Sequence, residues 1–221
     1  MYLTRSIEYN EINSGATIFL EDGYTFDGLF NSIDYNTNSS DGVFERVVSN
    51  IFYTSDIHII NLVIMNIELN QYGGGFVKKD SFGFHIKDCI SHNNLSFNYG
   101  TGKFFGNNCY DCSIVGSYSS GDISNNSGGI FGSDCYRCDV SACYSLGSIT
   151  TYSGGIFGSN CTHCNISTSY SCGYTSVYSG GMFGGENYYN TVTNSFSLSL
   201  LDTTSHGVCG ISSEYIECSN Y

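Results

Sequence analysis

Three pairs of cysteines form the residue pattern in this chain with the most evident chemistry. Each pair has two residues between its cysteines, and the pairs are Cys109 and Cys112, Cys135 and Cys138, and Cys161 and Cys164. Thiolates at this spacing bind zinc or act as a redox-active dithiol. Two stacked pairs would supply four thiolates to one Zn²⁺ ion, so these six residues are the candidate metal ligands.

The arrangement of the pairs favours a structural role over either chemistry. Three pairs do not divide into sets of four, and the residues 26 positions after the last pair are Asn187 and Asn190. A redox dithiol usually begins a helix, and no helix is expected here. We therefore predict no bound metal and no cofactor, with the cysteines packed in a ladder or joined by disulfides within or between coils. The total of 11 cysteines is odd, so at least one has no partner within a monomer.

Carboxylates give a weaker indication of catalysis. Enzymes that cleave polysaccharides on a β-helix group their acidic residues on one face, whereas positions 104 to 200 contain only Asp111, Asp122, Asp134, Asp139 and Glu186. Asp134 and Glu186 share a repeat position with two asparagines, which is typical of a corner ladder in which Asn and Asp satisfy a bend. The sequence therefore predicts no catalytic residues, and a glycan-active β-helix enzyme stays the alternative.

Histidines and tyrosines add no clear site. The five histidines do not repeat one another at the 26-residue step, so we expect no metal site among them. Tyrosines are abundant enough to line a glycan-binding surface. However, Tyr118, Tyr144 and Tyr170 lie beside expected core positions, so we predict that they face inward or flank the core.

The elements that position these residues follow from an internal repeat. Ser127-Gly-Gly-Ile-Phe-Gly132 recurs from Ser153 and Ser179, and in altered form from Thr101 and Ser205, always at a step of 26 residues. A constant period of this length indicates a solenoid, in which each coil buries its apolar face against its neighbours. One apolar column, which we expect to be buried, has the following members: Ile114, Val140, Ile166 and Val192.

The pattern within a repeat indicates strands. The segment 164–173 is rich in Ser, Thr and aromatic residues, and Ile166 and Tyr170 are an even number of residues apart. We predict an all-β, single-domain, right-handed parallel β-helix of single-stranded coils with a 26-residue repeat. Residues 1–55 are assigned to an irregular N-terminal cap and first coil, and residues 56–221 to the β-helix, with regular coils from residue 101.

These repeats resemble two groups of known proteins. The unit Ser-Gly-Gly-Ile-Phe-Gly, followed in the same repeat by Ile-x-x-x-Tyr-Ser-x-Gly, is similar to the GLUG-type repeat of bacterial surface proteins. That repeat reads Gly-Gly-Leu-Val-Gly and then Ile-x-x-Ser-Tyr-x-x-Gly. The inserted Cys-x-x-Cys, as in Asn160-Cys-Thr-His-Cys-Asn-Ile166, resembles repeat proteins of large DNA viruses of amoebae and algae. The resemblance implies a right-handed β-helix on a virion or an extracellular surface, with a structural rather than an enzymatic role.

Composition excludes other classes of function. The formal net charge is −13, with 7 basic residues, so the chain lacks the basic surface that nucleic-acid binding requires. The sequence contains no run of 18 apolar residues, so no membrane span is predicted. Residues 1–9 have no visible signal-peptide pattern. We therefore expect a non-enzymatic structural or interaction protein.

The pattern of the C-terminal repeat indicates which partners the protein has. It begins at Ser205 and keeps apolar residues at column positions, including Ile216 and Cys218, without a charged or helical cap. A last coil without a cover would expose unpaired backbone N–H and C=O groups, and the apolar core beneath it would be open. We expect this end to be covered by another structural protein, by a further copy of the chain, or by further residues if the sequence is a fragment, and glycans are the alternative ligands.

Overall fold

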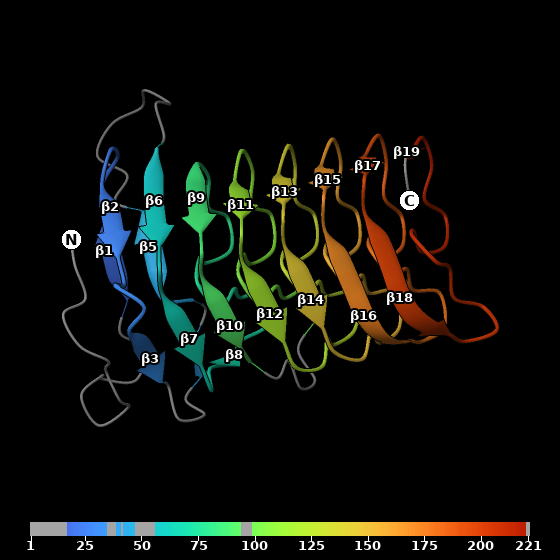
Figure 1. Cartoon of the computed structure of the whole chain (residues 1–221), viewed down its shortest axis with the longest axis horizontal. Coiled ribbons are helices and arrows are strands. Elements are labelled where there is room, and N and C mark those ends of the chain that lie inside the picture. The colour runs from blue at the N-terminus through green and yellow to red at the C-terminus, as the bar shows by residue number, and fades with distance from the viewer. Residues whose placement is uncertain (1–16, 35–38, 41, 47–55, 94–98, 220–221) are drawn as a thin grey trace.

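The chain forms an elongated parallel β-helix. The structure, a computed structural model, describes residues 17–34, 39–40, 42–46, 56–93 and 99–219. All regular secondary structure in these residues is β-strand, and the strands stack coil upon coil along the long axis of the molecule (Figure 1). Every strand pair is parallel, as expected when each coil returns to the same face one level further on. The predicted fold class is confirmed.

Two long sheets form two walls of the solenoid. The first sheet has eight strands in the described residues: β2 (Thr25–Asp27), β6 (Ile57–Ile60), β9 (Phe84–Lys87), β11 (Ser113–Val115), β13 (Asp139–Ser141), β15 (Asn165–Ser167), β17 (Thr191–Thr193) and β19 (Glu217–Ser219). The second has seven: β3 (Ser32–Asp34), β7 (Val63–Met65), β10 (Ile90–His92), β12 (Tyr118–Ser120), β14 (Tyr144–Leu146), β16 (Tyr170–Thr175) and β18 (Phe196–Leu201). Two short pairs complete the described strands: β1 (Ile18–Leu20) with β5 (Phe44–Arg46), and β4 (Ser39–Ser40) with β8 (Glu68–Leu69).

The predicted apolar column lies in the core of the first sheet. Ile114 pairs with Val140, Val140 with Ile166, and Ile166 with Val192, and all four side chains are buried. The column therefore confirms the 26-residue register. It continues toward the N-terminus with three more buried side chains, those of Ile86, Ile59 and Phe26.

A third wall consists of isolated bridges, and we call it the Gly-Phe wall. It comprises the repeated Ser-Gly-Gly-Ile-Phe-Gly segments, in which equivalent glycines and phenylalanines of successive coils pair in parallel. Phe105, Phe131, Phe157 and Phe183 are fully buried, with ring centroids 4.2, 4.8 and 5.1 Å apart along the ladder. The coil repeat imposes this stacking, because adjacent strands lie about 4.7–4.9 Å apart.

The middle glycines of this wall allow it to approach the second sheet. A Cβ atom on Gly129 would lie 2.0 Å from Ser145 Oγ and 2.1 Å from the carbonyl oxygen of Gly155. The equivalent position in the preceding coil is Lys103, whose side chain is fully buried. Only small residues fit on the facing strands, and Ser119, Ser145 and Ser171 are buried there.

The tyrosine column lies on the outer face of the second sheet, so of the two predicted placements, facing inward or flanking the core, the inward one is wrong. Tyr118, Tyr144 and Tyr170 stack with centroids 4.7 and 5.1 Å apart, but they are half-buried on the outer face of the second sheet. Successive strand residues point to opposite faces, and the serine after each tyrosine occupies the interior. The narrow space beside the Gly-Phe wall explains why serine takes the inner position.

The corner ladder appears as expected. Asn108, Asp134, Asn160 and Glu186 all have positive φ angles, between 55° and 58°. Asn and Asp tolerate this left-handed conformation better than other residues with side chains. These corners therefore let the chain change direction at the same place in each coil.

The two long sheets begin within the segment that the sequence assigns to a cap. Thr25 of β2 pairs with His58, and Ser32 of β3 pairs with Val63. These steps are longer than 26 residues, so a search for a constant period does not reveal them. The division at residue 55 stays a prediction, because residues 47–55 lie outside the described part of the chain.

Candidate functional sites

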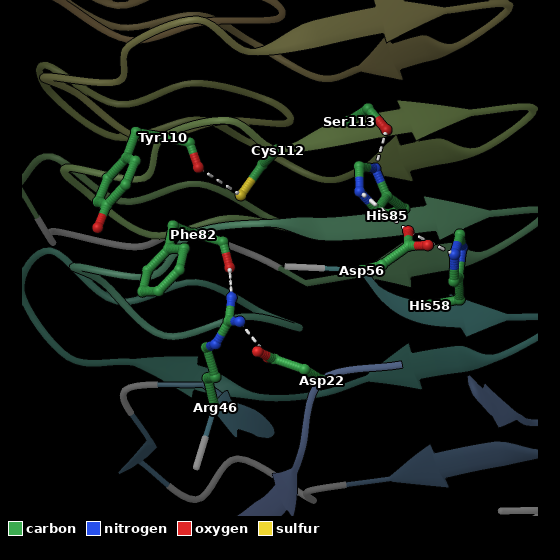
Figure 2. A network of polar contacts seen from close by, with 9 residues as sticks. All are labelled: Asp22, Arg46, Asp56, His58, Phe82, His85, Tyr110, Cys112 and Ser113. Carbon is green, nitrogen blue, oxygen red and sulfur yellow. Dashed lines mark hydrogen bonds and ion pairs between the residues drawn. The ribbon is translucent and has the colours of Figure 1, made fainter. Parts of the chain in front are cut away.

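The cysteine pairs lie inside the solenoid at the corner that precedes the first sheet. All six side chains are buried. Several thiols lie within hydrogen-bonding range of a carbonyl oxygen in the preceding coil: Cys138 Sγ is 3.5 Å from that of Cys109, and Cys164 Sγ is 3.7 Å from that of Cys135. Cys112 donates within its own coil, to the carbonyl oxygen of Tyr110 at 3.4 Å (Figure 2). The thiols therefore act as weak donors that satisfy backbone carbonyls at the bend.

The next coil shows what these positions require. Asn190 Nδ2 donates to the carbonyl oxygen of Cys161 at 2.9 Å, while its Oδ1 accepts from the backbone N–H of Cys164 at 2.7 Å. Asn187 Nδ2 likewise donates to a carbonyl oxygen of the Gly-Phe wall, that of Gly158, and Asn187 Oδ1 accepts from the backbone N–H of Cys161. A buried corner needs hydrogen-bond partners for its backbone groups, and either an amide or a thiol provides them.

Burial keeps these thiols protonated. Loss of hydration raises the pKa values of Cys109, Cys135, Cys138 and Cys161 above the usual range of a thiol. Zinc binds thiolates, whereas these groups donate hydrogen bonds to carbonyl oxygens. Within the described residues, no group of three or more His, Cys, Asp or Glu side chains is arranged to bind a metal ion.

No disulfide joins the cysteines. All eleven lie in the described part of the chain, and all carry free thiols. The six paired cysteines are buried and unbridged in this structure, and their role as a stabilising ladder stays a prediction. The absence of a bound metal stays a prediction, because it requires a measurement on the protein.

Two histidines come together on the outer face of the first sheet, and the sequence analysis missed them (Figure 2). His58 and His85 are register partners, with ring centroids 5.2 Å apart. The step between them is 27 residues, so a strict 26-residue alignment separates them. Asp56 Oδ1 lies 2.8 Å from His58 Nε2 and 3.6 Å from His85 Nε2.

Ser113 extends this cluster. Its Oγ lies 2.7 Å from His85 Nδ1, so a serine, a histidine and an aspartate follow one another as in an acyl-transfer triad. The contact between His85 and Asp56 is longer than a hydrogen bond. Ser113 also lies inside the parallel ladder between His85 and Asp139, where backbone N–H groups bond neighbouring strands instead of an oxyanion. The geometry is that of a polar ladder on a sheet surface.

Arg46 forms a second polar cluster, which is structural (Figure 2). Its guanidinium group pairs with Asp22 and donates to the carbonyl oxygen of Phe82 at 3.1 Å. The same group lies 4.0 Å from the centre of the Phe82 ring, and the side chain is buried. These contacts fasten the coil of Arg46 to the coils before and after it.

An exposed apolar face lies on β18. This strand is near the C-terminal end of the solenoid (Figure 1). Phe196, Leu198 and Leu200 alternate along this strand and are 46%, 64% and 76% exposed. On one side β18 pairs with β16, and among the described residues no strand pairs with its other side. We call this strand and its three apolar side chains the β18 edge.

Comparisons with known proteins do not assign the chain to a family. Neither a family model, nor a curated protein, nor a solved structure matches it. In the described residues, no helix has the length and apolar character needed to cross a membrane. A functional proposal therefore rests on the geometry of the chain itself.

Proposed function

We propose that this protein is a non-enzymatic structural solenoid that assembles with other polypeptides through the β18 edge. The observation that supports this proposal is an apolar edge strand in the last described coils, exposed on its outer face and paired on one side only. The partner strand comes from another structural protein, from a second copy of the chain, or from further residues of the same polypeptide.

The physical argument concerns the backbone first. An unpaired edge presents a row of N–H and C=O groups that can accept a further strand. Soluble proteins usually protect such edges with charged residues, bulges or proline, whereas β18 reads Phe-Ser-Leu-Ser-Leu-Leu. Strand addition would satisfy the backbone groups and extend the sheet, while the apolar side chains would be covered by the partner's outer face.

The resemblance to repeat proteins of large DNA viruses and of bacterial surfaces supports a location on a virion or an extracellular surface. A solenoid suits such a role, because its length grows by adding coils and its walls stay rigid. The free thiols stabilise it without a disulfide in this structure.

The experiment is analytical ultracentrifugation of residues 1–221 over a range of concentrations, with reducing agent present. Leu198→Lys together with Leu200→Lys places two charges on the β18 edge, and we expect it to abolish the concentration-dependent association of the wild-type protein. Leu146→Lys is the matched control, since Leu146 is a half-exposed leucine on the same sheet but in a strand paired on both sides. The proposal is wrong if the wild-type protein stays monomeric at high concentration, or if the control variant dissociates it equally well.

A further inference from the structure

A groove lies on one side of the solenoid, and none of its lining residues belongs to β18. Its volume is about 300 Å³. Residues from five successive coils line it: Tyr72, Tyr99, Asn126, Asp134, Tyr152 and Glu186, above a floor of serines. Ser133 and Ser159 are buried in that floor, and Ser159 Oγ donates to the carbonyl oxygen of Tyr152 at 2.6 Å. The groove is therefore built on ordered corners of the coils.

One wall of the groove has tyrosines where the backbone favours other residues. Tyr72 and Tyr152 have φ angles of 67° and 57°, in the left-handed region. The equivalent corners of the two intervening coils have Gly100 and Asn126, which tolerate this conformation far better. A bulky residue at such a position carries a conformational cost. Tyr178 occupies the same corner of the next coil with a φ of 60°, and its ring stacks on that of Tyr152 with centroids 5.4 Å apart, so stacking along the ladder offsets part of this cost.

The tyrosine side chains of this wall are partly exposed. Tyr99 and Tyr152 are 47% and 37% exposed. Tyr72 packs edge-on against Tyr99 with centroids 6.0 Å apart, and its ring covers Gly100, where a Cβ atom would lie 2.6 Å from Tyr72 Cδ1. An aromatic face with a hydroxyl at its edge binds a ligand surface that is part apolar and part polar.

The opposite wall consists of planar polar side chains at the corner ladder. Asp134, Asn160 and Glu186 follow one another from coil to coil and are exposed. Glu186 also has a positive φ angle, where the two preceding coils have the better-suited Asp and Asn. Carboxylates accept hydrogen bonds, and amides both donate and accept them, which matches the dual character of hydroxyl groups.

We propose that this groove binds a neutral oligosaccharide. Sugar rings have apolar C–H faces that stack on tyrosine and hydroxyl rims that bond carboxylates and amides. Two carboxylates line the groove, and none of its described lining residues is cationic, which disfavours phosphate, sulfate or nucleic acid as a ligand. A basic peptide is the competing occupant, but it would use only the acceptors, whereas Asn126 and Asn160 also offer donors.

The test is isothermal titration calorimetry with three probes: N-acetylchitohexaose, cellohexaose and mannohexaose. We expect at least one of them to bind. Tyr152→Asn should weaken that binding about tenfold or more, because it removes the stacking ring. The substitution introduces the residue that the preceding coil has at the same corner, so the backbone is accommodated. Tyr189→Asn is the matched control, because Tyr189 is an exposed tyrosine with a φ of 56° that lies outside this groove.

A second comparison separates the two occupants. Glu186→Gln keeps the shape and hydrogen-bonding capacity of the wall while removing a charge, so oligosaccharide binding should persist. A hexalysine peptide would lose affinity with this variant, since its binding depends on the carboxylate. The proposal is overturned if none of the three sugars binds at millimolar concentration, if Tyr152→Asn and Tyr189→Asn act alike, or if only hexalysine binds. Because the groove and the β18 edge are separate, monomeric protein can still be tested here.

Discussion

Lys103 is the residue whose environment departs most from that of its counterparts in other coils. It occupies the position of Gly129, Gly155 and Gly181, and its ammonium group donates to the carbonyl oxygen of Gly121. Burial lowers the pKa of Lys103 to about 7, although nearby Asp122 acts in the opposite direction. The protein therefore contains one interior cation that is close to losing its proton at neutral pH.

This environment predicts a pH-dependent contribution to stability. The unfolded chain has a lysine pKa of about 10.4, so between pH 7 and 9 the unfolded state binds more protons, and stability from this group rises with pH. Relative to Lys103→Met, the wild-type free energy of unfolding should increase by about 2 kcal/mol over that interval. Both proteins share the same thiols, so their ionisation cancels in the difference. Urea denaturation at several pH values provides the measurement, and a difference that does not change with pH contradicts the assignment.

One corner position of the coil accepts a thiol, a hydroxyl or an amide side chain. The column of Cys109, Cys135 and Cys161 continues with Asn187 and Ser213. Each type can donate to a backbone carbonyl, so the corner selects for size and donor capacity rather than for metal binding.

This interpretation predicts that metal removal has no effect. Protein purified in the presence of zinc should contain no stoichiometric metal by elemental analysis, and a chelator should leave its melting temperature unchanged. The reason is that protonated thiols bonded to carbonyl oxygens are not zinc ligands. About one equivalent of zinc per chain, lost together with the fold on chelation, would show that the pairs form metal sites.

At the scale of the coil, the Gly-Phe wall depends on close contact with the second sheet. The column of middle glycines tests this dependence, because its members differ in their surroundings. A Cβ atom on Gly129 would meet Ser145 and the backbone of Gly155, whereas one on Gly207 would meet no atom within 4 Å.

Gly129→Ala should therefore destabilise the protein by about 3 kcal/mol or more, since backbone cannot move aside without disturbing the next coil. Gly207→Ala, at the same position of the last described coil, should change stability by less than about 0.5 kcal/mol. Thermal or urea denaturation of the two variants measures the contrast. Equal effects would mean that the coils do not pack as closely as the structure shows.

The coil is also the scale at which sequence and structure agree best. The unbroken 26-residue step fixed the register of Ile114 with Val140, because a slip of one residue would have turned every side chain to the other face. The pairing of His58 with His85 escaped detection, since that coil has one residue more. The outward orientation of Tyr144 also escaped, because it depends on the space beside Gly129 and not on the tyrosine itself. The groove joins residues of different corners, whose proximity no single repeat reveals.

At the scale of the whole molecule, we propose that the solenoid assembles through the β18 edge. Stability in such a repeat protein is a sum of coil and interface contributions, so the terminal coils are the least stable unless a partner covers them. β16 and β18 have the same length, but within the described part of the chain β16 pairs on both sides and β18 on one.

Hydrogen exchange of residues 1–221, measured by mass spectrometry at low and at high protein concentration, tests this proposal. We expect the amides of 196–201 to exchange rapidly in dilute protein and to become protected at high concentration, while those of 170–175 are protected throughout. Slow exchange of 196–201 in dilute, monomeric protein would contradict it, because the edge would then be stable without a partner.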